Sequence, residues 1–144
     1  LTRQNLPQYP ESCPDAEKGA YILRDSVKEV PDVLLMASGS EVEQIYEAAG
    51  ILAEDGIDAR VISVPSFELF NRQSAEYKES VMPTAVRKRV AVEAACSFGW
   101  HQYIGLDGKM IGIDHFGASA PASRVFAEFG ITTENVVAAV KSLF

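Results

Sequence analysis

The chain has 144 residues, of which 47% are hydrophobic, and a formal net charge of −7 at pH 7. This length suits one domain with a full hydrophobic core, and the apolar content excludes an intrinsically disordered chain. The acidic balance argues against nucleic acid or an anionic membrane as a partner, and no apolar run approaches the roughly 20 residues of a membrane-spanning helix.

Cysteine and histidine usage bears on compartment and on metal binding. Cys13, Cys96, His101 and His115 lack the spacing of a metal site. Two isolated thiols favour a reducing cytoplasm, although one long-range disulfide would also fit this count. The first residues do not have the pattern of a signal peptide. We therefore expect a cytoplasmic protein and, because the chain starts with Leu1 rather than Met, a fragment of a longer polypeptide.

Residues 1–18 are polar and contain Pro7, Pro10 and Pro14. Proline removes a backbone donor and restricts the residue before it, so this segment is predicted to be an extended arm rather than a helix. Arg3 lies in this arm and, taken alone, is typical of a solvated surface arginine. The folded domain is predicted to cover residues 19–144.

Five short apolar runs are typical of strands buried in a sheet. They are residues 19–23, 33–37, 59–64, 90–95 and 110–113, and the first is expected at a sheet edge. Between them, apolar residues recur at helical spacing. Ser40 and Glu43 are placed as a capping box for a helix that ends at Gly56. Further helices are predicted at residues 66–71, 74–81 and 121–129, with Gly130 after the last of these, and from Thr132 to the end of the chain.

The alternation of strands and helices predicts an open α/β sheet, mostly parallel, with helices on both faces. Ligands of such sheets prefer the carboxyl ends of the strands. The residues expected at this edge are Ser38, Gly39, Ser40, Pro65, Ser66, Glu93, Asp114 and His115.

The junction Ser38-Gly39-Ser40 joins a strand to a helix and could bind a small anion through the first amides of that helix. The competing interpretation is plain helix capping. Capping is favoured because Glu41 and Glu43 put negative charge where the anion would sit, and because no full phosphate-loop fingerprint is present.

The other polar groups at this edge do not form a catalytic set. Glu93 interrupts an apolar run, so it is expected either to end the strand or to have a partner. Asp114 and His115 would point to opposite sides of a strand and make a poor acid–base pair. Ser119 misses the Gly-x-Ser-x-Gly nucleophile pattern at its last position, which favours a capping role.

Two segments resemble the C-terminal domain of transketolase. They are Thr2-Arg3-Gln4-Asn5-Leu6-Pro7 and Phe116-Gly117-Ala118-Ser119-Ala120-Pro121, the second preceded by Asp114-His115, and the resemblance extends over essentially the whole chain. It implies a three-layer α/β/α fold with an open sheet of about five mostly parallel strands and one antiparallel edge strand. It also implies that Arg3 helps to hold a substrate phosphate, a role that suits a planar guanidinium.

The resemblance further implies the chemistry of a parent enzyme. Transketolases transfer a two-carbon ketol unit from a ketose phosphate to an aldose phosphate in the pentose phosphate pathway. Their thiamine diphosphate and its Mg or Ca ion bind between two other domains, across a homodimer interface. The fragment alone is therefore predicted to bind no cofactor and to be inactive. Its expected partners are the preceding domains of the same chain, a second subunit and sugar phosphates. Because some transketolases carry arginine in place of His115, a proton-transfer role for His115 is not expected.

Two alternatives remain open. The same fold occurs in the C-terminal domains of related thiamine enzymes, namely the dehydrogenase components and deoxyxylulose-phosphate synthase. The isolated domain could instead be a regulatory module that binds a small anion at Ser38-Gly39-Ser40. It could also be a protein-interaction module that uses the aromatic cluster of Phe98, Trp100 and Tyr103.

Overall fold

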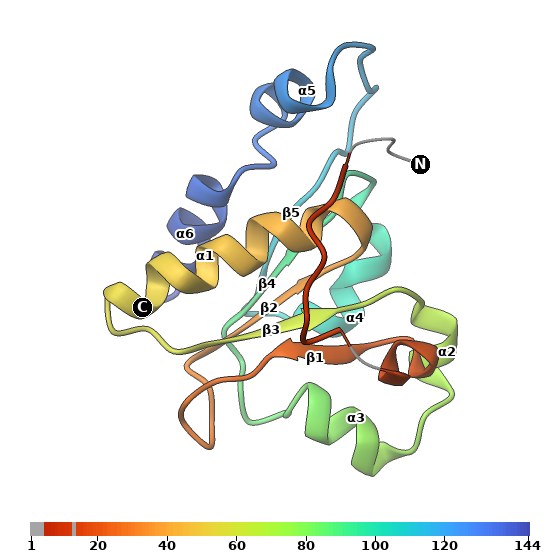
Figure 1. Ribbon diagram of the computed structural model, residues 1–144, viewed down its shortest axis with the longest axis vertical. Coiled ribbons are helices and arrows are strands. Elements are labelled where there is room, and N and C mark those ends of the chain that lie inside the picture. The colour runs from red at the N-terminus through yellow and green to blue at the C-terminus, as the bar shows by residue number, and fades with distance from the viewer. Residues whose placement is uncertain (1–4, 13) are drawn as a thin grey trace.

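A computed structural model describes residues 5–12 and 14–144 as a three-layer α/β/α sandwich (Figure 1). The central layer is a sheet of five strands in the order β1-β3-β2-β4-β5. The strands are β1 (Tyr21–Arg24), β2 (Val33–Ala37), β3 (Ala59–Ser63), β4 (Arg89–Val92) and β5 (Lys109–Ile111).

Among the strands of the described residues, β1 alone runs against its neighbour. It pairs antiparallel with β3 at one edge of the sheet, and the remaining pairs are parallel. Every residue of β2 and β3 is buried, as expected for parallel strands that are covered on both faces. The predicted mostly parallel sheet with one antiparallel edge strand is therefore confirmed.

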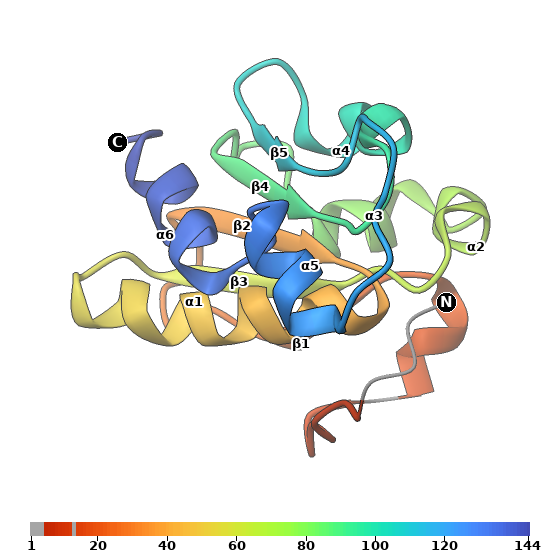
Figure 2. The ribbon, with the colours of Figure 1, turned by 90° about the horizontal axis from the view of Figure 1, so that it is seen from above.

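Helices cover both faces of the sheet (Figure 2). One face packs against α1 (Val42–Glu54) and α6 (Thr133–Lys141), and the other against α2 (Phe67–Asn71), α3 (Ala75–Val81) and α4 (His101–Ile104). A further helix, α5 (Ala122–Glu128), buries none of its residues. Because successive strand residues point to opposite faces, Leu35 lies in the α1–α6 core and Leu34 in the other core.

Several helix ends form as the local chemistry predicts. Gly56 and Gly130 adopt φ angles of 78° and 73° just beyond α1 and α5, a conformation that glycine reaches without steric cost. The hydroxyl of Thr132 accepts from the backbone N–H of Asn135 at 3.3 Å and caps α6. None of the helices within residues 5–12 and 14–144 is long and apolar enough to cross a bilayer.

The predicted capping box at the start of α1 is wrong. A 3-10 turn, η2 (Gly39–Glu41), precedes this helix, so the N-cap position falls on Glu41, which makes no side-chain cap bond. The Ser40 hydroxyl instead donates to Glu41 Oε1 at 2.8 Å. Ser40 lies inside this turn and not at the N-cap position, and for this reason it does not cap α1.

Two helical segments were not predicted. Within the predicted arm, Pro14–Lys18 forms a 3-10 helix, for which a leading proline is favourable because its missing N–H is not needed there. The turn Ser97–Trp100 and α4 form where only an aromatic cluster was recognised. They form because Trp100 and Tyr103, three residues apart, both reach the core. The strand predicted over residues 90–95 ends earlier, at Val92.

Candidate functional site

The carboxyl edge of the sheet brings together Ser38 and Glu93, which are 55 residues apart in sequence. Ala37 of β2 lies opposite Val92 of β4 in the parallel register, so the two residues that follow these strands are neighbours. The Ser38 hydroxyl donates to Glu93 Oε2 at 2.6 Å. Glu93 thus follows the end of its strand and also has a partner, and both expectations for it are confirmed.

A second carboxyl group, Glu41, lies at the same edge and is only 3% exposed. Burial raises its pKa, the Ser40 hydrogen bond opposes that rise, and the negative charge of Glu93 adds to it. Burial also raises the pKa of Glu93, against hydrogen bonds from Ser38 and Trp100. This edge therefore holds two acids that resist ionisation. The burial of Glu41 was not anticipated, since nothing in the sequence distinguishes it from an exposed helix-start glutamate.

The arm reaches the same edge. Leu6 and Pro7 line a cavity of about 240 Å³ together with Gly39, Ser40 and Pro65. The arm at residues 5–12 appears as the dark red segment beside the sheet in Figure 1. Two segments that are far apart in sequence, the arm and the β2–α1 junction, therefore form one surface.

Two tyrosines hold the arm against α1. The rings of Tyr9 and Tyr46 lie 4.5 Å apart between centroids, and the Tyr46 hydroxyl donates to Glu11 at 3.2 Å. Burial, with the nearby charges of Glu43 and Glu47, raises the pKa of Tyr9 to about 12. Tyr9 therefore keeps its proton at neutral pH and acts as a packing residue of the arm.

Asp114 and His115 do not contact each other as an acid–base pair. Asp114 Oδ1 accepts from the backbone N–H of Ser97 at 2.8 Å, and this bond lowers the pKa of Asp114. His115 Nδ1 lies 2.9 Å from the carbonyl oxygen of Phe116, and the His115 ring lies 4.8 Å from that of Phe129. They form no acid–base pair, but the reason differs from the one expected, because β5 ends at Ile111 and both residues lie in the loop beyond the strand.

The remaining predicted residues do not complete a catalytic centre. Arg3 and Cys13 lie outside the described residues. Ser119 is exposed. The Ser38 and Ser40 hydroxyls donate to carboxylates, which argues against a bare anion site at their junction. Within residues 5–12 and 14–144, no three His, Cys, Asp or Glu side chains gather as metal ligands would.

The aromatic cluster divides between core and surface. Trp100 and Tyr103 are 1% and 7% exposed and pack with Phe67, whose ring lies 4.9 Å from each of theirs. Phe98, by contrast, is 87% exposed. Core packing explains two of the three aromatic residues that were candidates for a protein interface.

Comparison with known proteins gives a consistent result. The family model described as "Transketolase-like TK C-terminal domain" matches residues 19–132. A transketolase of Bacillus subtilis (strain 168) is 50% identical over 147 residues, covering 99% of this chain and 22% of that protein. A chloroplastic transketolase of Craterostigma plantagineum is 52% identical over 145 residues, covering 99% of this chain and 28% of that protein.

A solved structure has the same fold. The transketolase from Leishmania mexicana aligns with a TM-score of 0.89 at 38% identity, over 97% of this chain and 20% of that chain. The chain therefore matches its relatives along nearly its whole length but spans less than a third of theirs.

Proposed function

This chain belongs to the transketolase family as a C-terminal domain, and we propose that in an intact enzyme it supports ketol transfer. The proposed reaction moves a two-carbon ketol unit from a ketose phosphate to an aldose phosphate. The observation that carries the proposal is the 50% identity to a transketolase over 99% of this chain. Because that alignment covers 22% of the relative, the activity is assigned to the intact protein and the chain alone is expected to be inactive.

Thiamine diphosphate and its Mg or Ca ion are proposed to bind to other domains of the enzyme. The described residues do not fit this group. None of them gather as a set of three metal-ligating side chains, and the 3-10 turn at the carboxyl edge presents buried Glu41 where a diphosphate would require donors. The role left to this chain is binding and orientation.

Residues 1–18 are proposed to be an arm that leads in from the preceding domain, and residues 19–144 to be the C-terminal domain itself. The packing of Tyr9 on Tyr46 supports a fixed path for the arm. Leu6 and Pro7, which line a cavity with Ser40, support a path along the carboxyl edge. The preceding domains and a second subunit are the proposed protein partners. The proposed compartment is the cytoplasm, and relatives named chloroplastic make the plastid the alternative.

Arg3 is proposed to bind the phosphate of the sugar substrate. It stands two residues before Asn5, the first described residue of the arm. A guanidinium can donate two parallel hydrogen bonds to phosphate oxygens, and this geometry is not available to lysine. The other half of such a clamp is assigned to domains outside this chain.

The test is steady-state kinetics of Arg3→Ala in the full-length enzyme, with a phosphorylated and an unphosphorylated ketose donor. Losing a hydrogen bond to a charged group costs about 1.5–3 kcal/mol, so kcat/KM for the phosphorylated donor should fall roughly 10- to 150-fold. The unphosphorylated donor should be nearly unaffected. The control is Arg72→Ala, which removes an exposed arginine beyond α2. Equal losses for both donors would refute the role of Arg3.

The alternatives are less well supported. A small-anion module at Ser38-Gly39-Ser40 is disfavoured because the hydroxyl groups of Ser38 and Ser40 already donate to the carboxylates of Glu93 and Glu41. The relatives compared are transketolases rather than other thiamine enzymes. A protein-interaction role is supported only by Phe98, because Trp100 and Tyr103 of the aromatic cluster are buried in the core.

A further inference from the structure

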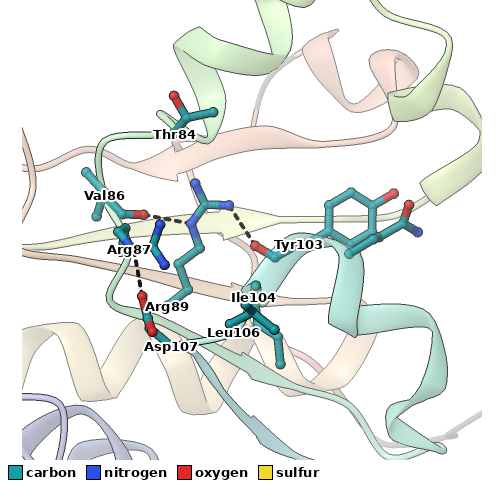
Figure 3. A pocket seen from close by; sticks show the side chains of 10 residues that line it. Thr84, Val86, Arg87, Arg89, Tyr103, Ile104, Leu106 and Asp107 are labelled. Carbon is teal, nitrogen blue, oxygen red and sulfur yellow. Dashed lines mark hydrogen bonds and ion pairs between the residues drawn. The ribbon is translucent and has the colours of Figure 1, made fainter.

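A cavity of about 310 Å³ lies at the amino edge of the sheet, beside the start of β4 (Figure 3). Its walls come from the loop before β4 and from the turn between α4 and β5. Arg87 and Arg89 both line it, and the end of α4 forms the facing wall. This edge lies opposite the one that carries Glu41 and Glu93.

Arg89 is held rigidly by backbone carbonyl groups. Its Nε donates to Val86 O at 2.7 Å, its Nη1 to Tyr103 O at 2.7 Å and its Nη2 to Pro83 O at 2.8 Å. No carboxylate of the described residues lies within ion-pair distance of this guanidinium. A partly buried positive charge is therefore oriented in advance by carbonyl dipoles, with the negative charge of Glu79 acting on it only from beyond ion-pair distance.

Arg87 places a second guanidinium at the same cavity. It pairs with Asp107, Nε to Oδ2 at 2.5 Å, and the two side chains are 68% and 54% exposed. An exposed pair of this kind contributes little and exchanges readily with other partners. Burial lowers the pKa of Arg89, the negative charge of Glu79 opposes this effect, and the positive charge of Arg87 adds to it. The two guanidinium groups therefore repel each other, and an anion placed between them would relieve this repulsion.

The rest of the cavity wall contains both apolar and polar side chains. Ile104 and Leu106 supply apolar surface, and Gln102 supplies a neutral amide. The amide nitrogen of Gln102 makes only a long bond, 3.4 Å to Gly99 O. The volume is at the lower limit of about 300 Å³ for small-ligand sites and exceeds what one tetrahedral anion needs. An anionic head with a small organic body fits these walls.

We propose that this cavity binds a phosphate monoester of a small metabolite, with its phosphate between Arg87 and Arg89 and its organic part against Ile104 and Leu106. Arg87 exchanges its contact with Asp107 for the ligand phosphate, and Arg89 contributes its fixed charge. Asp107 then competes with the ligand for Arg87. Removing the charge of Asp107 should therefore strengthen ligand binding, whereas removing the charge of Arg87 should weaken it. This inference does not depend on the proposed ketol transfer.

The experiment is an NMR titration of the 144-residue chain, whose sheet is covered on both faces by its own helices. The probes are inorganic phosphate and ribose 5-phosphate at constant ionic strength. Saturable shifts are expected at residues 84–89 and 102–107, with ribose 5-phosphate binding more tightly. Arg87→Gln should weaken binding roughly 10- to 100-fold, because a charge-assisted bond to the phosphate is lost.

Matched variants separate a site from general electrostatics. Asp107→Asn should tighten binding, whereas Arg124→Gln and Glu128→Gln, exposed on α5, change the net charge equally and should leave it unchanged. Non-saturating shifts, or equal affinity in Arg87→Gln, would overturn the proposal. So would shifts confined to the arm and the carboxyl edge. Inorganic phosphate binding as tightly as ribose 5-phosphate would overturn the assignment to a monoester.

Discussion

The two edges of the sheet carry charged side chains of opposite sign at similar depths. At the carboxyl edge, Glu41 is 3% exposed and Glu93 is half-buried; at the amino edge, Arg60 is 8% exposed and Arg89 is half-buried. The acids contact side-chain donors, including the hydroxyl groups of two serines. The arginines mainly contact backbone carbonyl groups.

The direction of the helices explains this difference. Helices in an α/β sheet run against the strands, so their last carbonyl groups lie at the amino edge and lack partners within the helix. Arg60 donates to Ser80 O and Val81 O at the end of α3, and Arg89 donates to Tyr103 O in α4. Positive charge is also favourable at these helix ends. At the amino edge, backbone carbonyl groups can therefore accept from most donors of the buried arginines, and Asp25 accepts from the Nε of Arg60 at 2.7 Å. At the carboxyl edge, serine hydroxyl groups donate to both acids, together with backbone N–H groups in the case of Glu41.

The largest expected effect is at Arg89. Arg89→Ala removes the donors that hold four separate carbonyl groups, one of them at 3.5 Å, and leaves those carbonyls without these donors, so we expect a loss of about 3 kcal/mol in the free energy of unfolding. Urea denaturation of the 144-residue chain measures it. The control, Arg124→Ala on the exposed α5, should change stability by less than about 0.5 kcal/mol. If Arg89→Ala cost no more than this control, water would be satisfying the carbonyls and the comparison of the edges would fail.

The next effect depends on pH and concerns Glu41. Because its folded-state pKa is raised from 4.5, the wild-type chain loses stability as pH rises from that value through the raised one. Glu41→Gln has no such titration. The stability of the variant relative to wild type should therefore increase between about pH 4 and about pH 7, by on the order of 1 kcal/mol. Denaturation at both pH values measures this difference.

Asp114→Asn is the matched control for that pH series. The pKa of Asp114 is lowered from 3.8 by the bond from Ser97, so its contribution is present above 3.8 and is lost only at more acidic pH. Its difference from wild type should stay flat between about pH 4 and about pH 7. A flat difference for Glu41→Gln as well would show that Glu41 ionises as freely as a surface glutamate.

The smallest effect is expected for the exposed pair Arg87–Asp107. A double-mutant cycle with Arg87→Ala and Asp107→Ala should give a coupling energy below about 1 kcal/mol that decreases further in high salt. This would distinguish the exposed arginine of the amino edge from the backbone-bound Arg89 next to it. A salt-independent coupling above about 2 kcal/mol would mean that Asp107 is a fixed structural partner and not a group that a ligand displaces.

Much of the fold could be predicted because its signals are local. The apolar runs of β2 and β3 and the glycines after α1 and α5 identified strands and helix ends within a few residues. The start of α1 could not be predicted, because the sequence pattern does not show that a 3-10 turn precedes the helix and moves its N-cap position from Ser40 to Glu41. The 3-10 turn Ser97–Trp100 and α4 were not predicted, because these short helical segments form only where Trp100 and Tyr103 pack in the core.

The candidate site, like the fold, could be predicted from the sequence only in part. The sequence alone was sufficient for the mostly parallel sheet, for the family resemblance and for placing Ser38 and Glu93 at one edge, since strand ends follow from local patterns. Only the tertiary structure decided that these two side chains share a hydrogen bond, because that depends on the register between β2 and β4. It likewise decided that Arg89 binds carbonyl groups from α4 and from the loop after α3, because those groups converge only when these segments pack beside the sheet.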